Sequence, residues 1–183
     1  RFCRTIIKKF EKEIRINMYY PEDISIVSSI IAGRIELPEI KSRLESLWVK
    51  LFNDESYRSK IPKSHYWYEN NHVSKCKYVE YVQLHKSEKG SAINLKESEH
   101  KTRIYSVITS RGDGRNVVLL LNMTENCLKL ISGNKIGLRY ESFFHIGLTR
   151  AKRKLFFHLH KNNDNIHMRF NTLDNVYIEP NIT

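Results

Sequence analysis

Apolar residues in the first third of the chain follow the periods of a helix, a strand and a second helix. Residues 2–16 place apolar side chains at helical spacing, and Pro21 then breaks that pattern. Residues 24–27 read as a short strand, and Pro38 has the preference of a first helical residue. The expected inward positions of the two helices are Ile6, Ile7, Phe10 and Ile14, and then Ile40, Leu44, Leu47, Trp48 and Leu51. A strand followed by a helix is the building unit of a parallel sheet.

The middle of the chain is less regular. Residues 53–77 are polar and aromatic without a clean period, which predicts an insertion or a long loop. Residues 78–84 alternate like a strand, and the charged and small residues of 86–100 predict another loop. The aromatic cluster at 65–68 could stack on bases, but clustered aromatics more often lie in a core or anchor a loop.

Strand and helix patterns alternate through the second half. Residues 103–109 and 153–159 read as strands, and the continuous apolar run at 117–121 is typical of a strand buried on both faces. Thr124 can cap a short helix through Leu130, and residues 140–152 fit a longer helix. The pattern predicts an α/β fold in which a parallel sheet is flanked by helices.

Charge and cysteine content narrow the classes of partner and compartment. The 183 residues carry 31 Lys and Arg against 20 Asp and Glu, a formal charge of +11 that favours nucleic acid. No apolar run approaches the roughly 20 residues that cross a bilayer, so we expect no membrane span. Three widely spaced cysteines predict no disulfide framework and fit a reducing compartment, the cytoplasm or the nucleus.

The most informative motif is Gly147-Leu148-Thr149-Arg150-Ala151-Lys152, which follows an aromatic-rich stretch and precedes a predicted strand. It resembles motif VI of UvrD/Rep-like superfamily 1 helicases, and the resemblance implies the second, RecA-like motor domain of such an enzyme. An arginine is suited to this place because its guanidinium stabilises charge on a transferring γ-phosphoryl group. By the resemblance Arg150 is the catalytic arginine finger, and it binds ATP together with Thr149. Without the resemblance, Arg150 reads as a surface arginine at a helix end.

A second segment, Ser106-Val107-Ile108-Thr109-Ser110-Arg111-Gly112-Asp113-Gly114, resembles motif V of the same family and lies about 40 residues before the first. The resemblance assigns nucleic-acid contacts to Ser106, Thr109, Ser110 and Arg111, and ATP contacts to Gly112, Asp113 and Gly114. Hydroxyls can hold phosphates, and glycines let a backbone approach closely. Two departures stand out, because Ile108 replaces a histidine and Gly114 replaces a ribose-contacting glutamate. Asp113 is then the candidate to contact the ribose, and a plain Gly-Asp-Gly turn is the alternative.

Residues 21–27 resemble the strand that carries motif IV, after which the family places an arginine near the ATP phosphates. Arg34 and Arg43 are both candidates for that arginine, and each is also a plausible surface residue. A metal cluster of His65, His72 and Cys76 is disfavoured, because its spacing matches no common zinc pattern.

The chain contains no Gly-x-x-x-x-Gly-Lys phosphate loop and no acidic pair after a buried strand. We therefore expect the phosphate loop and the ligands of Mg²⁺, which accompanies ATP, on a first motor domain upstream of Arg1. The expected domains are a RecA-like domain at 1–160 and a tail at 161–183. The fragment alone is then inactive, and the whole protein is an ATP-dependent DNA helicase or translocase on a single strand.

Two alternatives remain at this point. A non-catalytic basic module could keep this fold and bind nucleic acid, which the departures at Ile108 and Gly114 favour and the intact run at 149–152 opposes. A helicase–nuclease fusion subunit would need an acidic nuclease domain downstream.

Overall fold

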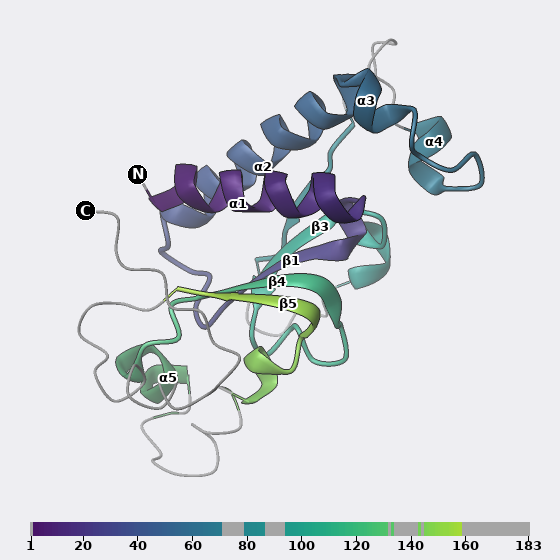
Figure 1. The fold of residues 1–183 in the computed structure, drawn as a ribbon. Helices are drawn as coiled ribbons and strands as arrows, with labels where there is room; N and C mark the ends of the chain where they lie inside the picture. The colour runs from purple at the N-terminus through teal and green to yellow at the C-terminus, as the bar shows by residue number, and fades with distance from the viewer. Residues whose placement is uncertain are drawn as a thin grey trace.

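The protein is built on a five-stranded sheet in which all neighbouring strands are parallel (Figure 1). The computed structural model describes residues 2–70, 79–86, 94–131, 133, 143 and 145–158. The strands lie in the order β2-β3-β1-β4-β5. They are β1 Ile24–Ser28, β2 Val82–Leu84, β3 Thr102–Ser106, β4 Arg115–Leu121 and β5 Ala151–Phe157. The predicted α/β fold with a parallel sheet is confirmed at this level.

Strand β1 is the central strand of the sheet, and both of its faces are buried. Ile26 is in register with Ile104 of β3 on one side and with Leu119 of β4 on the other. All five residues of β1 are buried. Strand β4 is also almost wholly buried, as the apolar run at 117–121 predicted.

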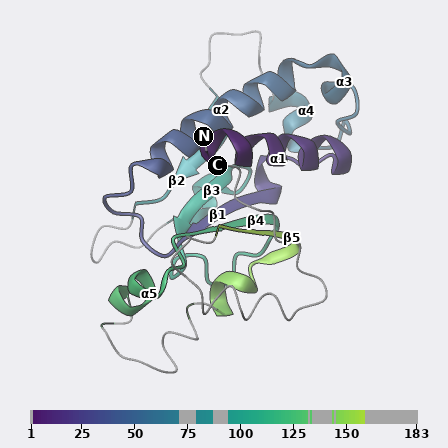
Figure 2. The ribbon, with the colours of Figure 1, turned by 60° about the vertical axis from the view of Figure 1, so that its left-hand side comes forward.

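Two long helices cover one face of the sheet. Helix α1 spans Phe2–Asn17 and helix α2 spans Glu36–Asn53, and both lie on the same side of the strands in Figures 1 and 2. Their apolar stripes meet the side chains of Ile24, Ile26 and Leu119 in the larger of two cores. Trp48 anchors α2 to the sheet, because its indole N–H donates to Thr102 Oγ1 at 3.0 Å.

The opposite face is covered by smaller pieces. These are the eight-residue connection 107–114 between β3 and β4, the short helix α5 Glu125–Ile131, and a helical turn at 145–148. The smaller core on this face consists of Val27, Tyr105, Val107, Val118, Leu120 and Met123. A parallel connection usually contains a helix, but here the chain returns in eight residues along the face of the sheet.

Most predicted elements are present, with shifted ends. Helix α1 has its expected inward residues, except that Ile7 is only partly buried, and α2 begins two residues before Pro38. Strand β3 ends at Ser106 and not at Thr109. The predicted helix 140–152 is wrong at its end, because the chain turns at 149–150 and Ala151 already begins β5.

The stretch 53–77, expected as an insertion or a long loop, contains two short helices in its described part. Helices α3, Glu55–Arg58, and α4, Tyr66–Asn70, follow α2. Tyr57, Ile61 and Trp67 are buried and join the larger core, where Trp67 packs against Phe52. These isolated anchors have no helical or strand period, which is why the sequence pattern did not reveal them.

Two 3-10 turns, η1 Pro21–Asp23 and η2 Leu95–Ser98, precede the amino ends of β1 and β3. Residues 71–78, 87–93 and 159–183 lie outside the described residues, so the predicted tail and the residues His72 and Cys76 are not placed. None of the described helices is both long enough and apolar enough to span a membrane.

Candidate functional site

Arg150 lies in the turn that joins the helical residues 145–148 to strand β5. Its Nε donates to the carbonyl of Ile146 at 2.9 Å, and its Nη2 donates to Thr149 Oγ1 at 3.0 Å. The third contact leaves the turn, because Nη1 donates to the carbonyl of Ser110 at 3.4 Å. The Thr149 hydroxyl donates to the carbonyl of His145 at 2.9 Å.

The backbone of Arg150 joins the same two segments a second time. The N–H of Arg115, at the start of β4, donates to the carbonyl of Arg150 at 3.0 Å. A Cβ atom added at Gly114 would lie 3.4 Å from that carbonyl oxygen and 3.2 Å from Lys152 Cε. The stretch that resembles motif VI therefore lies directly against the connection that resembles motif V.

Ser106 and Thr109 form a hydroxyl pair at the carboxyl end of β3. Their oxygen atoms are 2.9 Å apart, and the backbone N–H of Thr109 donates to Ser106 Oγ at 3.2 Å. Neither residue is buried. In parallel sheets, the carboxyl ends of the strands are the usual place for ligands.

The other two expected nucleic-acid contacts differ in exposure. Ser110 is fully buried and its hydroxyl donates to the carbonyl of Val107 at 2.8 Å, so in this structure the hydroxyl cannot reach a phosphate. Arg111 is exposed, beside the exposed side chain of Ile108. Gly112 follows with a φ of +79°, a conformation that favours glycine, and it completes the predicted turn.

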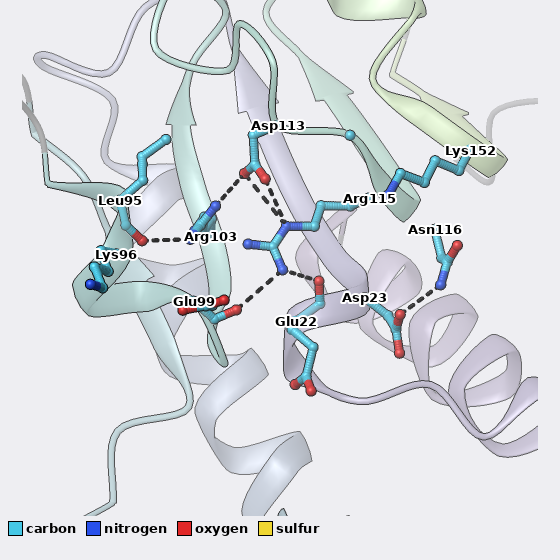
Figure 3. Close-up of a pocket in the computed structure, with 11 residues that line it drawn as sticks. Glu22, Asp23, Leu95, Lys96, Glu99, Arg103, Asp113, Arg115, Asn116 and Lys152 are labelled. Carbon is cyan, nitrogen blue, oxygen red and sulfur yellow. Dashed lines mark hydrogen bonds and ion pairs between the residues drawn. The ribbon is translucent and has the colours of Figure 1, made fainter. Parts of the chain in front are cut away.

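Asp113 is the centre of an ionic network in the wall of a pocket (Figure 3). Its carboxylate lies 2.7 Å from Arg103 Nη1 and 3.3 Å from Arg115 Nε. The Tyr105 hydroxyl donates to the same carboxylate at 2.9 Å. The carboxylate thus accepts from three donors, with which a ribose hydroxyl would have to compete. The expected ribose contact of Asp113 stays a prediction.

The network holds three charged side chains that are largely buried. Both arginine side chains are nearly buried, and their remaining donors reach carbonyl oxygens of Leu95, Ser98, Glu22 and Glu99. Burial alone would raise the pKa of Asp113, but the hydrogen bond from Arg103 and the charge of Arg115 outweigh burial and lower it. Burial also raises the pKa of Tyr105, which keeps that hydroxyl protonated as a donor.

A pocket of about 570 Å³ opens beside this network at the amino ends of the strands. Its cationic lining residues are Lys96, Arg103, Arg115 and Lys152, and its acidic ones are Glu22, Asp23, Glu99 and Asp113. The two sets balance, so the lining offers no surplus of positive charge to an anion. Burial raises the pKa of Glu22, whose carboxylate accepts the indole N–H of Trp67 at 2.7 Å.

The two arginines proposed for motif IV lie elsewhere. Arg34 follows the carboxyl end of β1 and donates to Cys127 Sγ at 3.1 Å. Arg43 lies on α2 in an ion pair with Glu39 at 2.8 Å. Arg150 precedes the amino end of β5, so the structure brings neither arginine to it.

Sequence reasoning missed Arg103 and Arg115 as members of the site. A signal was present, because an arginine begins or nearly begins each of two strands that are mostly buried. Charged residues are rarely buried unless they are paired. That rule would have predicted an acidic partner nearby, and Asp113 lies between the two in sequence.

Among the described residues, no group of three or more His, Cys, Asp or Glu side chains is placed to hold a metal ion. In the aromatic cluster, Trp67 is buried, while Tyr66 and Tyr68 are each more than 40% exposed. Tyr66 stacks on His100 with ring centroids 3.8 Å apart, so its ring is already covered from one side.

Comparison of the sequence with protein-family models and with curated proteins found no match.

Proposed function

We propose that this chain is the RecA-like second motor domain of an ATP-dependent DNA helicase or translocase, with Arg150 as its arginine finger. The observation that carries the proposal is the double contact of Arg150 with the connection 107–114. Its guanidinium contacts the carbonyl of Ser110, and its carbonyl accepts the N–H of Arg115. Two motif-like segments about 40 residues apart in sequence therefore form one unit.

This arrangement suits an arginine that acts on a nucleotide held by another domain. The hydrogen bond from Arg150 Nη1 to Ser110 is 3.4 Å long, beyond the usual range for N–H···O, so a phosphate oxygen could replace it at little cost. The phosphate loop and the Mg²⁺ ligands would come from the first motor domain. Closure of the two domains on ATP would then bring the guanidinium to the γ-phosphoryl group.

The same unit offers groups to a nucleic-acid strand. The hydroxyl of Ser106 lies at the end of β3, and the hydroxyl of Thr109 and the exposed side chain of Arg111 lie on the connection that follows it. Phosphate contacts of this kind position a strand without reading its sequence. A strand bound there would contact the connection that also holds Arg150, which would couple binding of the strand to hydrolysis.

A non-catalytic nucleic-acid-binding module is the second candidate, and one observation favours it. Gly114 has no side chain and the carboxylate of Asp113 is engaged by two arginines, so this connection presents no free carboxylate to a ribose. A module that binds nucleic acid without hydrolysing ATP would need no such carboxylate.

The deciding experiment measures ATPase activity of the full-length protein with and without single-stranded DNA, for the wild type and Arg150→Ala. We expect stimulated turnover in the wild type and a fall of about a hundredfold or more in the variant, with DNA affinity retained. Arg150→Lys should be nearly as defective, because an ammonium group lacks the planar fork of donors.

Arg153→Ala is the matched control, because this exposed arginine lies three residues away on β5. Its turnover should match the wild type. A wild-type protein that binds DNA but shows no turnover would overturn the motor proposal and leave the binding module.

A further inference from the structure

The outward face of α1 carries three cations in a line. Arg4, Lys8 and Lys12 are spaced four residues apart and all three are exposed. The helix buries Phe10 on its opposite side. None of the three cations has a hydrogen bond or an ion pair with another residue that the structure describes. We call these three residues the α1 stripe.

The carboxylates that flank the α1 stripe are already neutralised. Glu11 pairs with Arg15 and Lys50, at 3.2 and 2.8 Å, on the side that faces α2. On the side that faces β5, Glu13 pairs with Lys154. The charge of the stripe is therefore not compensated by its neighbours on the same helix.

Glu39 of α2 comes near the amino end of α1, where burial and the Glu39 carboxylate raise the pKa of the Cys3 thiol. Its carboxylate is paired with Arg43 at 2.8 Å. The α2 flank therefore leaves the stripe uncompensated as well.

The α1 stripe and the connection 107–114 lie on opposite sides of the sheet. Helices α1 and α2 form one outer layer, while the connection and α5 lie on the other face (Figures 1 and 2). The buried face of α1 packs on the sheet, so the stripe points away from it into solvent. A ligand on the stripe would not touch Ser106, Thr109 or Arg111.

We propose that the α1 stripe binds the phosphodiester backbone of a second segment of nucleic acid. Eight residues of helix rise about 12 Å, and one strand of a duplex presents a phosphate about every 3.4 Å along the axis. The three cations thus match the length of three to four phosphates. This inference goes beyond the proposed function and does not depend on ATP chemistry.

An acidic protein is a poorer fit to the same surface. Protein interfaces depend on buried apolar or aromatic anchors near their centre. Among the described residues of α1, Ile16 is the large hydrophobic side chain that is well exposed, at 66%, and it lies beyond the carboxyl end of the stripe. A row of charges without a central anchor is typical of a sequence-independent phosphate contact.

The test is the salt dependence of duplex and single-strand binding by the full-length protein, for the wild type and the triple variant R4A/K8A/K12A. Each phosphate contact contributes about 0.9 to the slope of log K against log salt for duplex and about 0.7 for a single strand. We expect the triple variant to lower the slope by about 2.7 for duplex or about 2 for a single strand, and to bind at least tenfold more weakly at low salt.

The matched control is K60A/K63A/K86A, which removes the same charge from three exposed lysines away from α1. This control should keep the wild-type slope, and both triple variants should keep the wild-type melting temperature because the changed side chains are exposed. An equal fall in slope for both triple variants would show that loss of any three positive charges weakens binding, and it would overturn the proposal.

An unchanged slope for R4A/K8A/K12A would also overturn it. If that variant instead loses binding to vesicles of anionic lipid while nucleic-acid binding is unchanged, the stripe is a membrane contact. Arg111→Ala separates the two surfaces, because its effect should add to that of the triple variant if they bind different segments. These outcomes are read from binding and not from ATPase activity. Failure of the stripe proposal can therefore be distinguished from failure of the proposed function.

Discussion

The two faces of the sheet are stabilised in different ways. On the helical face, the large side chains of α1 and α2 pack on β1 and β4 in a continuous apolar core. On the other face a smaller core is supplemented by the buried network of Asp113, Arg103 and Arg115. The first face supplies most of the apolar burial, while the second fixes the path of one connection. The residues that resemble helicase motifs V and VI are on the second face, where specific polar contacts contribute more than buried apolar area.

The largest effect should come from truncating a side chain in the core of the helical face. Trp48 is fully buried and hydrogen-bonded to Thr102, so Trp48→Ala should lower the free energy of unfolding by about 3–5 kcal/mol. Urea denaturation monitored by circular dichroism measures this. Val49→Ala on the exposed side of the same helix should cost less than about 1 kcal/mol. Equal losses for the two variants would contradict the described packing of α2.

A smaller but more specific effect is expected on the other face. Asp113→Asn removes the carboxylate between two nearly buried arginines and should lower the free energy of unfolding by about 2–3 kcal/mol. The pKa of Asp113 is lowered in the folded state, so its ionised form stabilises the fold at neutral pH. That contribution is lost as the pH falls from about 4 through the folded-state pKa.

The difference between the wild type and Asp113→Asn should therefore shrink as the solution is acidified. Denaturation curves at a series of pH values between neutral and acid test this. A difference that stays constant across the acid range would show that the network is not ionic.

The smallest effect should come from the turn inside the connection. Gly112 has a φ of +79°, so Gly112→Ala should cost about 1 kcal/mol through backbone strain. Gly114→Ala is the matched comparison, because its φ is ordinary and its Cβ would meet the flexible end of Lys152. Thermal melts of the two variants should rank Gly112→Ala as the less stable. The reverse order would mean that the space at Gly114 matters more than the backbone at Gly112.

The same contrast explains what could be predicted from the sequence. Helices α1 and α2 have apolar residues at helical spacing and strand β4 holds a continuous apolar run, so most of their buried residues could be identified from the sequence. The ends of β3 and of the helix before β5 could not, because a backbone hydrogen bond from Ser110 to Ser106 and the turn at Arg150 decide them. Local turns of this kind have little signature in apolar spacing.

The sequence singled out two segments that lie in contact, but not how the side chains of the candidate site pair. The resemblance located Arg150 and the connection 107–114, and the structure brings them together. It could not reveal that Asp113 pairs with Arg103 and Arg115, because that depends on the strand register that brings the two arginines to one carboxylate. The burial of Ser110 has the same origin, since the connection is held against the sheet.

The central position of β1 also has a consequence for how the chain is made. Both neighbours of β1 follow it late in the sequence, because β3 begins at Thr102 and β4 at Arg115. During synthesis, the buried strand Ile24–Ser28 leaves the ribosome several seconds before either partner exists. Both of its edges stay unpaired for that time, and such edges readily associate with other chains. Folding of this domain should therefore be slow and sensitive to concentration, and the nascent chain should depend on chaperones that shield β1.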